Sequence, residues 1–245
     1  MLRKLIALLV LTFTVISCQF TETMTLNKDG SGRLSIEMDL SEMMAIGGEM
    51  AKDSTLTKTD TIISFKDIFE EKKDSIAQLS AKEQRQLRAM EAYNIHMVTD
   101  PETNQMVVDI FIDFKDVSQA NDLMKGFEET GNLIPGMEED NANEEESDDT
   151  NVAVNYSFKK GVFKRDAYII DAEKHKTQVD SLGSVESFMS GMTYKLKYTF
   201  PRKIKKSSSE DATYSLDGKT IELQRTFLEY LKNPDVLDLE VELEK

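Results

Sequence analysis

The side chain with the most specific chemistry in this sequence is its single thiol, Cys18. Arg3 and Lys4 make a basic start, residues 5–17 are thirteen residues without a charge, and a small residue stands directly before the thiol. This order is typical of a secretory signal that is removed from the mature protein. The apolar run is shorter than the ~20 residues that a spanning helix needs. We therefore predict a signal peptide over residues 1–17.

The residues around the thiol resemble the lipobox of bacterial lipoproteins. Val15 and Ile16 supply the two aliphatic positions, Ser17 the small residue and Cys18 the thiol. The resemblance implies that Cys18 is diacylated on sulfur, becomes residue one and anchors the chain, because several acyl chains hold a protein stably on a membrane. The alternative is a buried cysteine behind an ordinary signal. By the same resemblance, Gln19 favours the outer membrane, with the protein facing the periplasm.

The composition excludes several classes of function. The net charge is −15, so nucleic acid and anionic headgroups repel the molecule as a whole. With Cys18 acylated, no thiol remains for a disulfide or a thiolate metal site. We expect no cofactor, no nucleic acid partner and a membrane contact made through the acyl chains. A hydrophobic content of 40% supports one domain or two small ones, and we expect a single domain over residues 18–245.

Several segments alternate apolar and polar residues with a period of two, which predicts strands with one buried face. The predicted strands cover residues 33–40, 93–99, 104–114, 152–158, 162–169, 192–200 and 237–243. Turn signals at Asp29-Gly30, Lys160-Gly161 and Asp217-Gly218 fit hairpins. One-sided strands belong to antiparallel sheets with one solvated face. We therefore predict an α+β fold, an antiparallel β-sheet of hairpins with interspersed helices packed on one face.

Three stretches have helical spacing instead. They cover residues 66–93 with a break at Ser80, residues 117–127 and residues 172–182. Helices are therefore expected between the hairpins.

One internal segment has a composition that does not fold alone. Residues 138–149 contain eight acidic residues out of twelve and no aromatic residue. We expect a solvated, flexible acidic loop over about residues 137–151. The alternative is an acidic loop that binds a cation.

Two hairpins resemble those of LppM-like bacterial lipoproteins. The first contains Asn27-Lys28-Asp29-Gly30-Ser31-Gly32, and the second contains Leu216-Asp217-Gly218-Lys219-Thr220-Ile221 after Tyr198-Thr199-Phe200-Pro201. The resemblance implies an α+β domain with an antiparallel sheet. In one branch of that family it also implies a connection with envelope glycolipids.

The sequence offers little material for a metal site or for catalysis. His96 stands alone in a predicted strand, and His175 lies on the apolar face of a predicted helix, where we expect a packed or half-exposed histidine. The turn around Gly30 has the oxygen and glycine order of a calcium loop, but its register places Ile36 where a bidentate glutamate is required. No nucleophile elbow and no phosphate-binding glycine loop occur. We expect no metal site, no catalytic residue and no enzyme.

Two groups of basic residues stand out in an acidic chain. The larger group predicts a site for an anionic partner, and it consists of Lys195, Lys197, Arg202, Lys203, Lys205 and Lys206. A second basic edge is expected around Lys159, Lys160, Lys164 and Arg165. The alternative for both groups is protection of exposed strands against aggregation.

Three functions fit these observations. The first is a membrane-tethered, non-enzymatic envelope lipoprotein that acts as a binding or structural module, with an envelope protein or a glycolipid as its partner. The second is a carrier that holds an acyl chain or glycolipid in an internal cavity, lined by adaptable methionines such as Met38, Met43, Met44 and Met50. The third is an envelope hydrolase. A large apolar cavity favours the carrier, whereas a filled core with an exposed apolar patch favours a protein partner.

Overall fold

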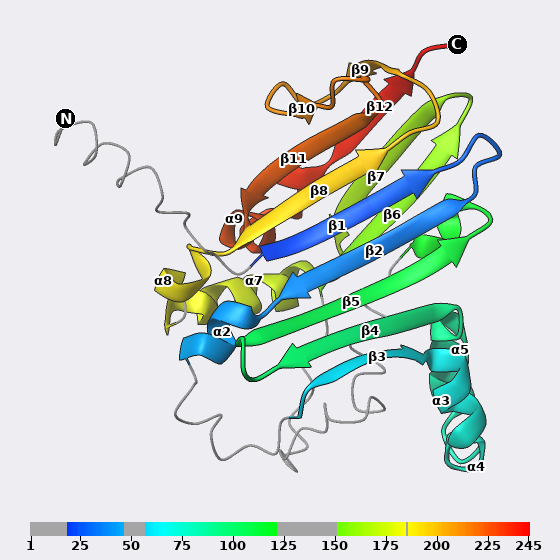
Figure 1. Cartoon of the computed structure of the whole chain (residues 1–245), viewed down its shortest axis with the longest axis vertical. Coiled ribbons are helices and arrows are strands. Elements are labelled where there is room, and N and C mark those ends of the chain that lie inside the picture. Colours follow the sequence, from blue (N-terminus) through cyan, green and yellow to red (C-terminus); the bar gives the residue numbers. More distant parts are fainter. Residues whose placement is uncertain (1–18, 47–56, 122–150, 185) are drawn as a thin grey trace, which may run out of the picture.

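The computed structural model describes residues 19–46, 57–121, 151–184 and 186–245. The predicted signal peptide, Cys18 and the acidic segment 138–149 lie outside the described residues. Within them, the chain forms two β-sheets and several short helices, so the predicted α+β class is confirmed (Figure 1).

The larger sheet, sheet A, contains eight described strands. In spatial order these are β10 (Thr213–Tyr214), β11 (Thr220–Thr226), β8 (Thr193–Thr199), β1 (Gln19–Leu26), β2 (Gly32–Asp39), β5 (Gln105–Phe114), β4 (Tyr93–Asp100) and β3 (Thr59–Ser64). Sheet B has the order β6 (Val152–Lys159), β7 (Val162–Ile169), β12 (Leu239–Leu243) and β9 (Ile204–Ser207).

The predicted turns lie where the sequence placed them. Gly30 and Gly218 have φ of 88° and 70° between paired antiparallel strands, and Lys160 and Gly161 have φ of 53° and 79° between β6 and β7. Positive φ is least costly for glycine, so these positions fix the hairpin registers.

Some of the described helices lie in the stretches predicted to be helical, and others were not predicted. The described helices are α2 (Ser41–Ile46), α3 (Phe65–Glu71), α4 (Lys73–Ile76), α5 (Ala81–Met90), α7 (Ala172–Ser181), α8 (Glu186–Met189) and α9 (Phe227–Lys232), with 3₁₀ turns η2 (Val117–Ala120), η4 (Leu182–Ser184) and η5 (Pro234–Leu237). The break at Ser80 and the helix over 172–182 are confirmed. The helix expected over residues 117–127 is a 3₁₀ turn over Val117–Ala120, and residues 122–127 lie outside the described part.

The structure adds two features to the predicted antiparallel sheet. The hairpin β6–β7 and strands β9 and β12 form a separate sheet, and β1 pairs with β8 in parallel, in the register Gln19 to Thr193. The alternation of apolar residues reveals the buried face of a strand, but it carries no information about which distant strand becomes its neighbour.

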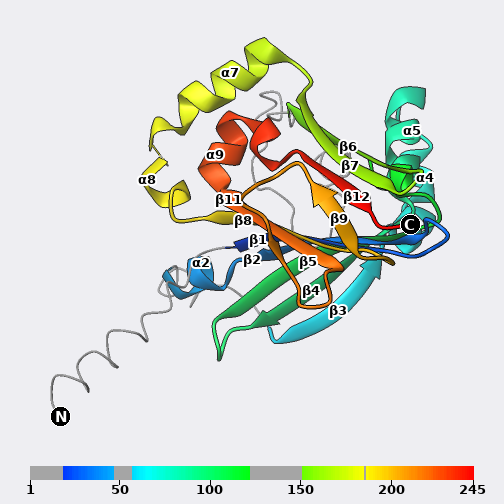
Figure 2. The ribbon, with the colours of Figure 1, turned by 90° about the horizontal axis from the view of Figure 1, so that it is seen from above.

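The core lies between sheet A on one side and sheet B with the helices on the other. Figure 2 shows sheet B, α7 and α9 on the same side of sheet A. The face of β8 predicted to be apolar is buried, as are the apolar face of β12 and two residues of the apolar face of β2. Those side chains include Met192, Tyr194, Leu196, Tyr198, Phe200, Leu34, Ile36, Leu239, Val241 and Leu243. In the described residues, no helix is both long and apolar enough to cross a membrane.

Candidate functional site

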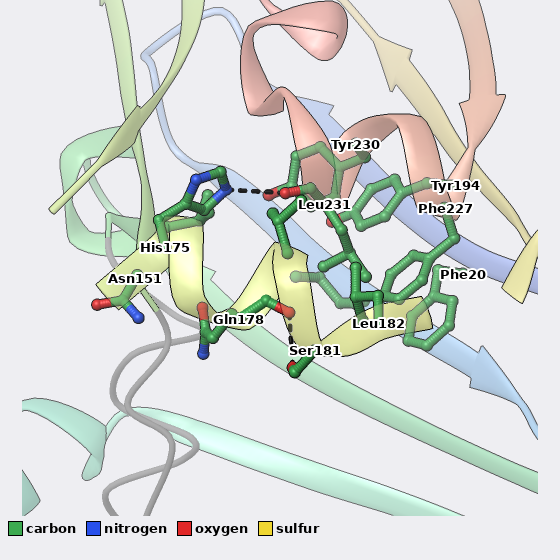
Figure 3. Close-up of a pocket in the computed structure, with 13 residues that line it drawn as sticks. Phe20, Asn151, His175, Gln178, Ser181, Leu182, Tyr194, Phe227, Tyr230 and Leu231 are labelled. Carbon is green, nitrogen blue, oxygen red and sulfur yellow. Dashed lines mark hydrogen bonds between the residues drawn. The ribbon is translucent and has the colours of Figure 1, made fainter. Parts of the chain in front are cut away.

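A pocket of about 300 Å³ lies between sheet A and the helices α7 and α9 (Figure 3). Its lining comes from both sheets as well as from the helices and is mostly apolar. The lining residues are Phe20, Ile36, Asn151, Val152, His175, Gln178, Val179, Ser181, Leu182, Tyr194, Phe227, Tyr230 and Leu231. The volume is at the lower end of the range of small-molecule sites in proteins.

Both helices over the pocket are fixed at their N-termini. The Asp171 carboxylate accepts hydrogen bonds from the backbone N–H groups of Glu173 and Lys174, at 2.9 and 3.1 Å, and so caps α7. Thr226 and Glu229 form a capping box at the start of α9. The caps determine where each helix begins and therefore which side chains face the sheet.

One end of the pocket is aromatic. The rings of Phe20 and Phe227 are stacked with centroids 4.3 Å apart and planes 10° apart, and Tyr194 lies parallel to Phe227 at 6.2 Å. Figure 3 shows these rings close to Leu182 at one end of the pocket. This end offers flat apolar surfaces to a ligand.

The other end of the pocket carries the polar side chains Asn151, His175 and Gln178 (Figure 3). His175 is buried, and its Nε2 donates a hydrogen bond of 2.8 Å to the carbonyl oxygen of Leu231 on α9. The expectation of a packed histidine is therefore confirmed. The bond joins α7 to α9 across the pocket.

A buried ionic network lies next to the pocket. The carboxylate of Glu22 on β1 and the guanidinium of Arg165 on β7 are both fully buried, with Nη2 3.2 Å from Oε2. Three tyrosine hydroxyls also donate to this carboxylate: Tyr156 at 2.6 Å, Tyr194 at 2.9 Å and Tyr198. Because these residues belong to both sheets, the network ties sheet A to sheet B.

Arg165 has further partners besides the carboxylate. Its Nη1 donates to the carbonyl oxygen of Leu237 at 3.2 Å, and its guanidinium lies 5.7 Å from the ring centroid of Tyr230. The expectation that Arg165 belongs to a basic surface edge is therefore wrong. Arg165 shares a face of β7 with Phe163 and Ala167, which are buried.

The ionisation of the network follows from these contacts. Burial raises the pKa of the Glu22 carboxyl. The charge of Arg165 and the hydroxyls of Tyr156 and Tyr198 lower this pKa by a larger amount, so the net shift is downward. Burial and the nearby Glu22 charge raise the pKa of the three tyrosines. Glu22 is therefore an anion and the tyrosines are neutral donors at neutral pH.

The network and the pocket share two side chains. Tyr194 and Tyr230 line the pocket, while the hydroxyl of Tyr194 is bonded to Glu22 and the ring of Tyr230 faces Arg165. The ionic network therefore fixes the rings that form the inner wall of the pocket.

Sequence reasoning did not identify Glu22, although a signal for it exists. Every second residue of β1 points to the buried face of the sheet. These residues are Phe20, Glu22, Met24 and Leu26, so a carboxylate stands among apolar residues. Arg165 interrupts the apolar phase of β7 in the same way. Two opposite charges in apolar phases indicate a buried ion pair, because an isolated buried charge is very unfavourable.

The pKa shift of Glu22 predicts a loss of stability in acid. A lowered folded-state pKa gives a stabilising contribution that is present above the ordinary value of 4.5 and is lost as the pH falls through the folded-state value. We expect Glu22→Gln to reduce the slope of unfolding free energy against pH by up to ~1.4 kcal/mol per pH unit in acid. Urea unfolding at a series of pH values below neutrality measures this slope. An unchanged slope would show that Glu22 does not titrate with unfolding.

The larger basic group is divided between the two sheets. Lys195 and Lys197 lie on β8, with Nζ atoms 2.9 and 3.8 Å from the carboxylate of Glu222. The other four residues, Arg202, Lys203, Lys205 and Lys206, lie on the connection to β9 and on β9, the edge strand of sheet B. Arg202 donates to the carbonyl oxygen of Glu244, and Lys205 pairs with Glu242 at 2.6 Å. The site for an anionic partner stays a prediction.

The remaining sequence candidates do not gather into a site. The imidazole of His96 pairs with Asp60 at 2.8 Å on the edge of sheet A. No group of three or more potential metal ligands occurs among the described residues. Met44 is buried and Met38 packs against the core, but neither lines the pocket. The side chain of Met43 and the whole of Met50 lie outside what the structure describes.

Comparison with known proteins assigns no family. No protein family and no curated protein matches this sequence. Among solved structures, the chain is similar to the folded domain of the LppM protein of Mycobacterium tuberculosis, with 9% identity and a TM-score of 0.38 over 93% of this chain and 90% of that domain. A similarity of this size identifies neither a family nor a function.

Proposed function

We propose that this protein is a lipid-anchored, non-enzymatic binding module of the bacterial envelope, which takes a narrow apolar group such as an acyl chain into the pocket under α7 and α9. The observation that carries the proposal is the pocket itself. It has about 300 Å³ of space and an apolar lining at its aromatic end. Of the three functions suggested by the sequence, the carrier is the one that requires such a cavity.

The lining favours an aliphatic chain with a small polar end. Burial of each methylene group contributes about 0.8 kcal/mol, so a few methylenes against Phe20, Leu182 and Phe227 supply useful affinity. The side chains of Asn151 and Gln178 lie at the opposite end, where a polar group of the ligand would find hydrogen-bonding partners. A bulky charged ligand would meet no charged partner among the described lining residues.

The chemistry of the lining supports binding rather than catalysis. His175 already donates its Nε2 proton to Leu231, and burial raises the pKa of Tyr194 and Tyr230, so these tyrosines are weak acids. The carboxylate of Glu22 is held by Arg165 and three tyrosine hydroxyls and is fully buried behind the wall. A hydrolase requires a nucleophile and a base that reach the same bound group.

Titration of the unacylated mature chain, residues 18–245 produced without the signal, tests the pocket. The probe is the neutral fluorophore N-phenyl-1-naphthylamine. We expect a saturable rise in fluorescence and its reversal by decanoic acid. A rise that does not saturate, or that decanoic acid does not reverse, contradicts the proposal.

The anchor is tested at Cys18, which supplies the sulfur that the acyl transferase requires. In a host that makes lipoproteins, Cys18→Ala should abolish the incorporation of labelled palmitate and the membrane partitioning of the protein. Ser17→Ala is the matched control, because it keeps a small residue before the thiol. Unchanged palmitate labelling of the Cys18→Ala variant would refute the anchor.

A further inference from the structure

The pocket lies close to the first residue of β1, which follows Cys18 in the sequence. Gln19 is the first residue of β1, and Phe20 directly after it lines the pocket. Gln19 is paired on both sides, with Asp39 of β2 and with Thr193 of β8. The chain therefore enters the sheet at a fixed place beside the aromatic end of the pocket.

We propose that one acyl chain carried by Cys18 occupies the pocket of its own protein. The inference rests on the proposed function, because it requires both the acylation of Cys18 and a pocket that accepts an aliphatic chain. Two Cα–Cα steps separate Cys18 from Phe20, so the Cα atoms are at most ~7.6 Å apart. An acyl chain longer than this distance can therefore reach the pocket.

The aromatic end suits a chain that is attached at Cys18. Phe20, Phe227 and Leu182 meet at this end, while the polar side chains Asn151 and His175 lie at the far end. A chain that starts beside Phe20 thus passes its methylenes along the apolar surfaces. A free fatty acid would instead place its carboxylate near the polar end.

Tethering favours this occupant over a free lipid. A group linked through a short connection has an effective concentration of about 1 mM or more at a site within its reach. At equal intrinsic affinity, the chain on Cys18 therefore occupies the pocket ahead of scarcer free ligands. Its withdrawal from the bilayer leaves fewer acyl chains as anchors, so occupancy of the pocket weakens membrane attachment.

Photocrosslinking of the acylated protein, produced from the full-length sequence, tests the proposal. A palmitate analogue with a diazirine near its middle is incorporated in a host that makes lipoproteins, and crosslinked peptides are mapped by mass spectrometry after irradiation. We expect crosslinks from the Cys18 acyl group to α7 and α9, around Val179 and Leu231. Val179→Trp, which places an indole in the pocket, should reduce these crosslinks about tenfold, because the indole takes up the space and an added acyl chain would overpack the cavity. Thr177→Trp adds the same bulk on the exposed side of α7 and should leave them unchanged.

Three outcomes would overturn the proposal. The first is a labelled Cys18 that crosslinks only to lipids, and the second is crosslinking to α7 and α9 that persists in Val179→Trp. The third is crosslinking between copies in a mixture of light and isotopically heavy protein. If the unacylated chain still binds N-phenyl-1-naphthylamine in those cases, the proposed function stands and only the occupant is wrong. If the unacylated chain binds no probe, the pocket function itself fails.

Discussion

Glu22→Ala is expected to cost about 3–5 kcal/mol of the free energy of unfolding, because it leaves the buried guanidinium of Arg165 without its counter-charge. The variant also removes the acceptor of three buried tyrosine hydroxyls. For a chain of this length the midpoint of thermal unfolding should fall by roughly 10 °C. Chemical and thermal unfolding followed by circular dichroism measure both quantities.

The matched control is Asp113→Ala. Asp113 also forms two hydrogen bonds with an arginine, Arg33, each 2.7 Å long, but both side chains are more than half exposed. Loss of an exposed pair changes stability by less than ~1 kcal/mol. Equal costs for Glu22→Ala and Asp113→Ala would contradict the role of burial.

A double-mutant cycle separates the pair from its surroundings. The cost of Glu22→Ala combined with Arg165→Ala should be smaller than the sum of the single costs by about 2 kcal/mol or more, since the double variant leaves no unpaired charge. Costs that add within ~0.5 kcal/mol would show that the two residues act independently.

Val179→Trp is expected to weaken the binding of N-phenyl-1-naphthylamine to the unacylated mature chain by at least tenfold, about 1.4 kcal/mol of binding free energy. Val179 lines the pocket and is half-buried, so a larger side chain extends into the existing space rather than into the packed core. Fluorescence titration gives the dissociation constant.

Thr177→Trp is the matched control for this prediction. Thr177 is exposed on the same helix, two residues away, and its side chain contacts only the carbonyl oxygen of Glu173 among the described hydrogen bonds. It should bind the probe as the unmodified chain does. Equal losses in both variants would mean that tryptophan disturbs α7 generally.

Much of the fold could be predicted from local patterns. The turn at Gly30, the helix that contains His175 and the buried face of β8 each depend on residues close together in the sequence. The parallel pairing of Gln19 with Thr193 could not be predicted, because it joins segments far apart in the chain. The division into two sheets could not be predicted for the same reason.

The candidate site shows the same limit more strongly. Histidine, cysteine and lysine carry reactive or charged groups that can be recognised in a sequence, but the pocket is lined by Phe20, Leu182 and Phe227, which are common core residues. An apolar residue that lines a cavity has the same sequence pattern as one that fills a core. By contrast, Glu22 could have been found as a charge in an apolar phase of β1.

Methyl NMR of the unacylated mature chain during a titration with decanoic acid tests the pocket at the level of single residues. If the ligand binds in the pocket, we expect saturable shifts of the methyl groups of Val179, Leu182 and Leu231, with contacts between these methyls and the ligand chain. The exposed methyls of Ile62 and Leu216 lie outside the pocket and should not shift. No saturable shift at the three pocket residues, or the largest shifts at Ile62 and Leu216, would contradict the assignment of this pocket as the binding site.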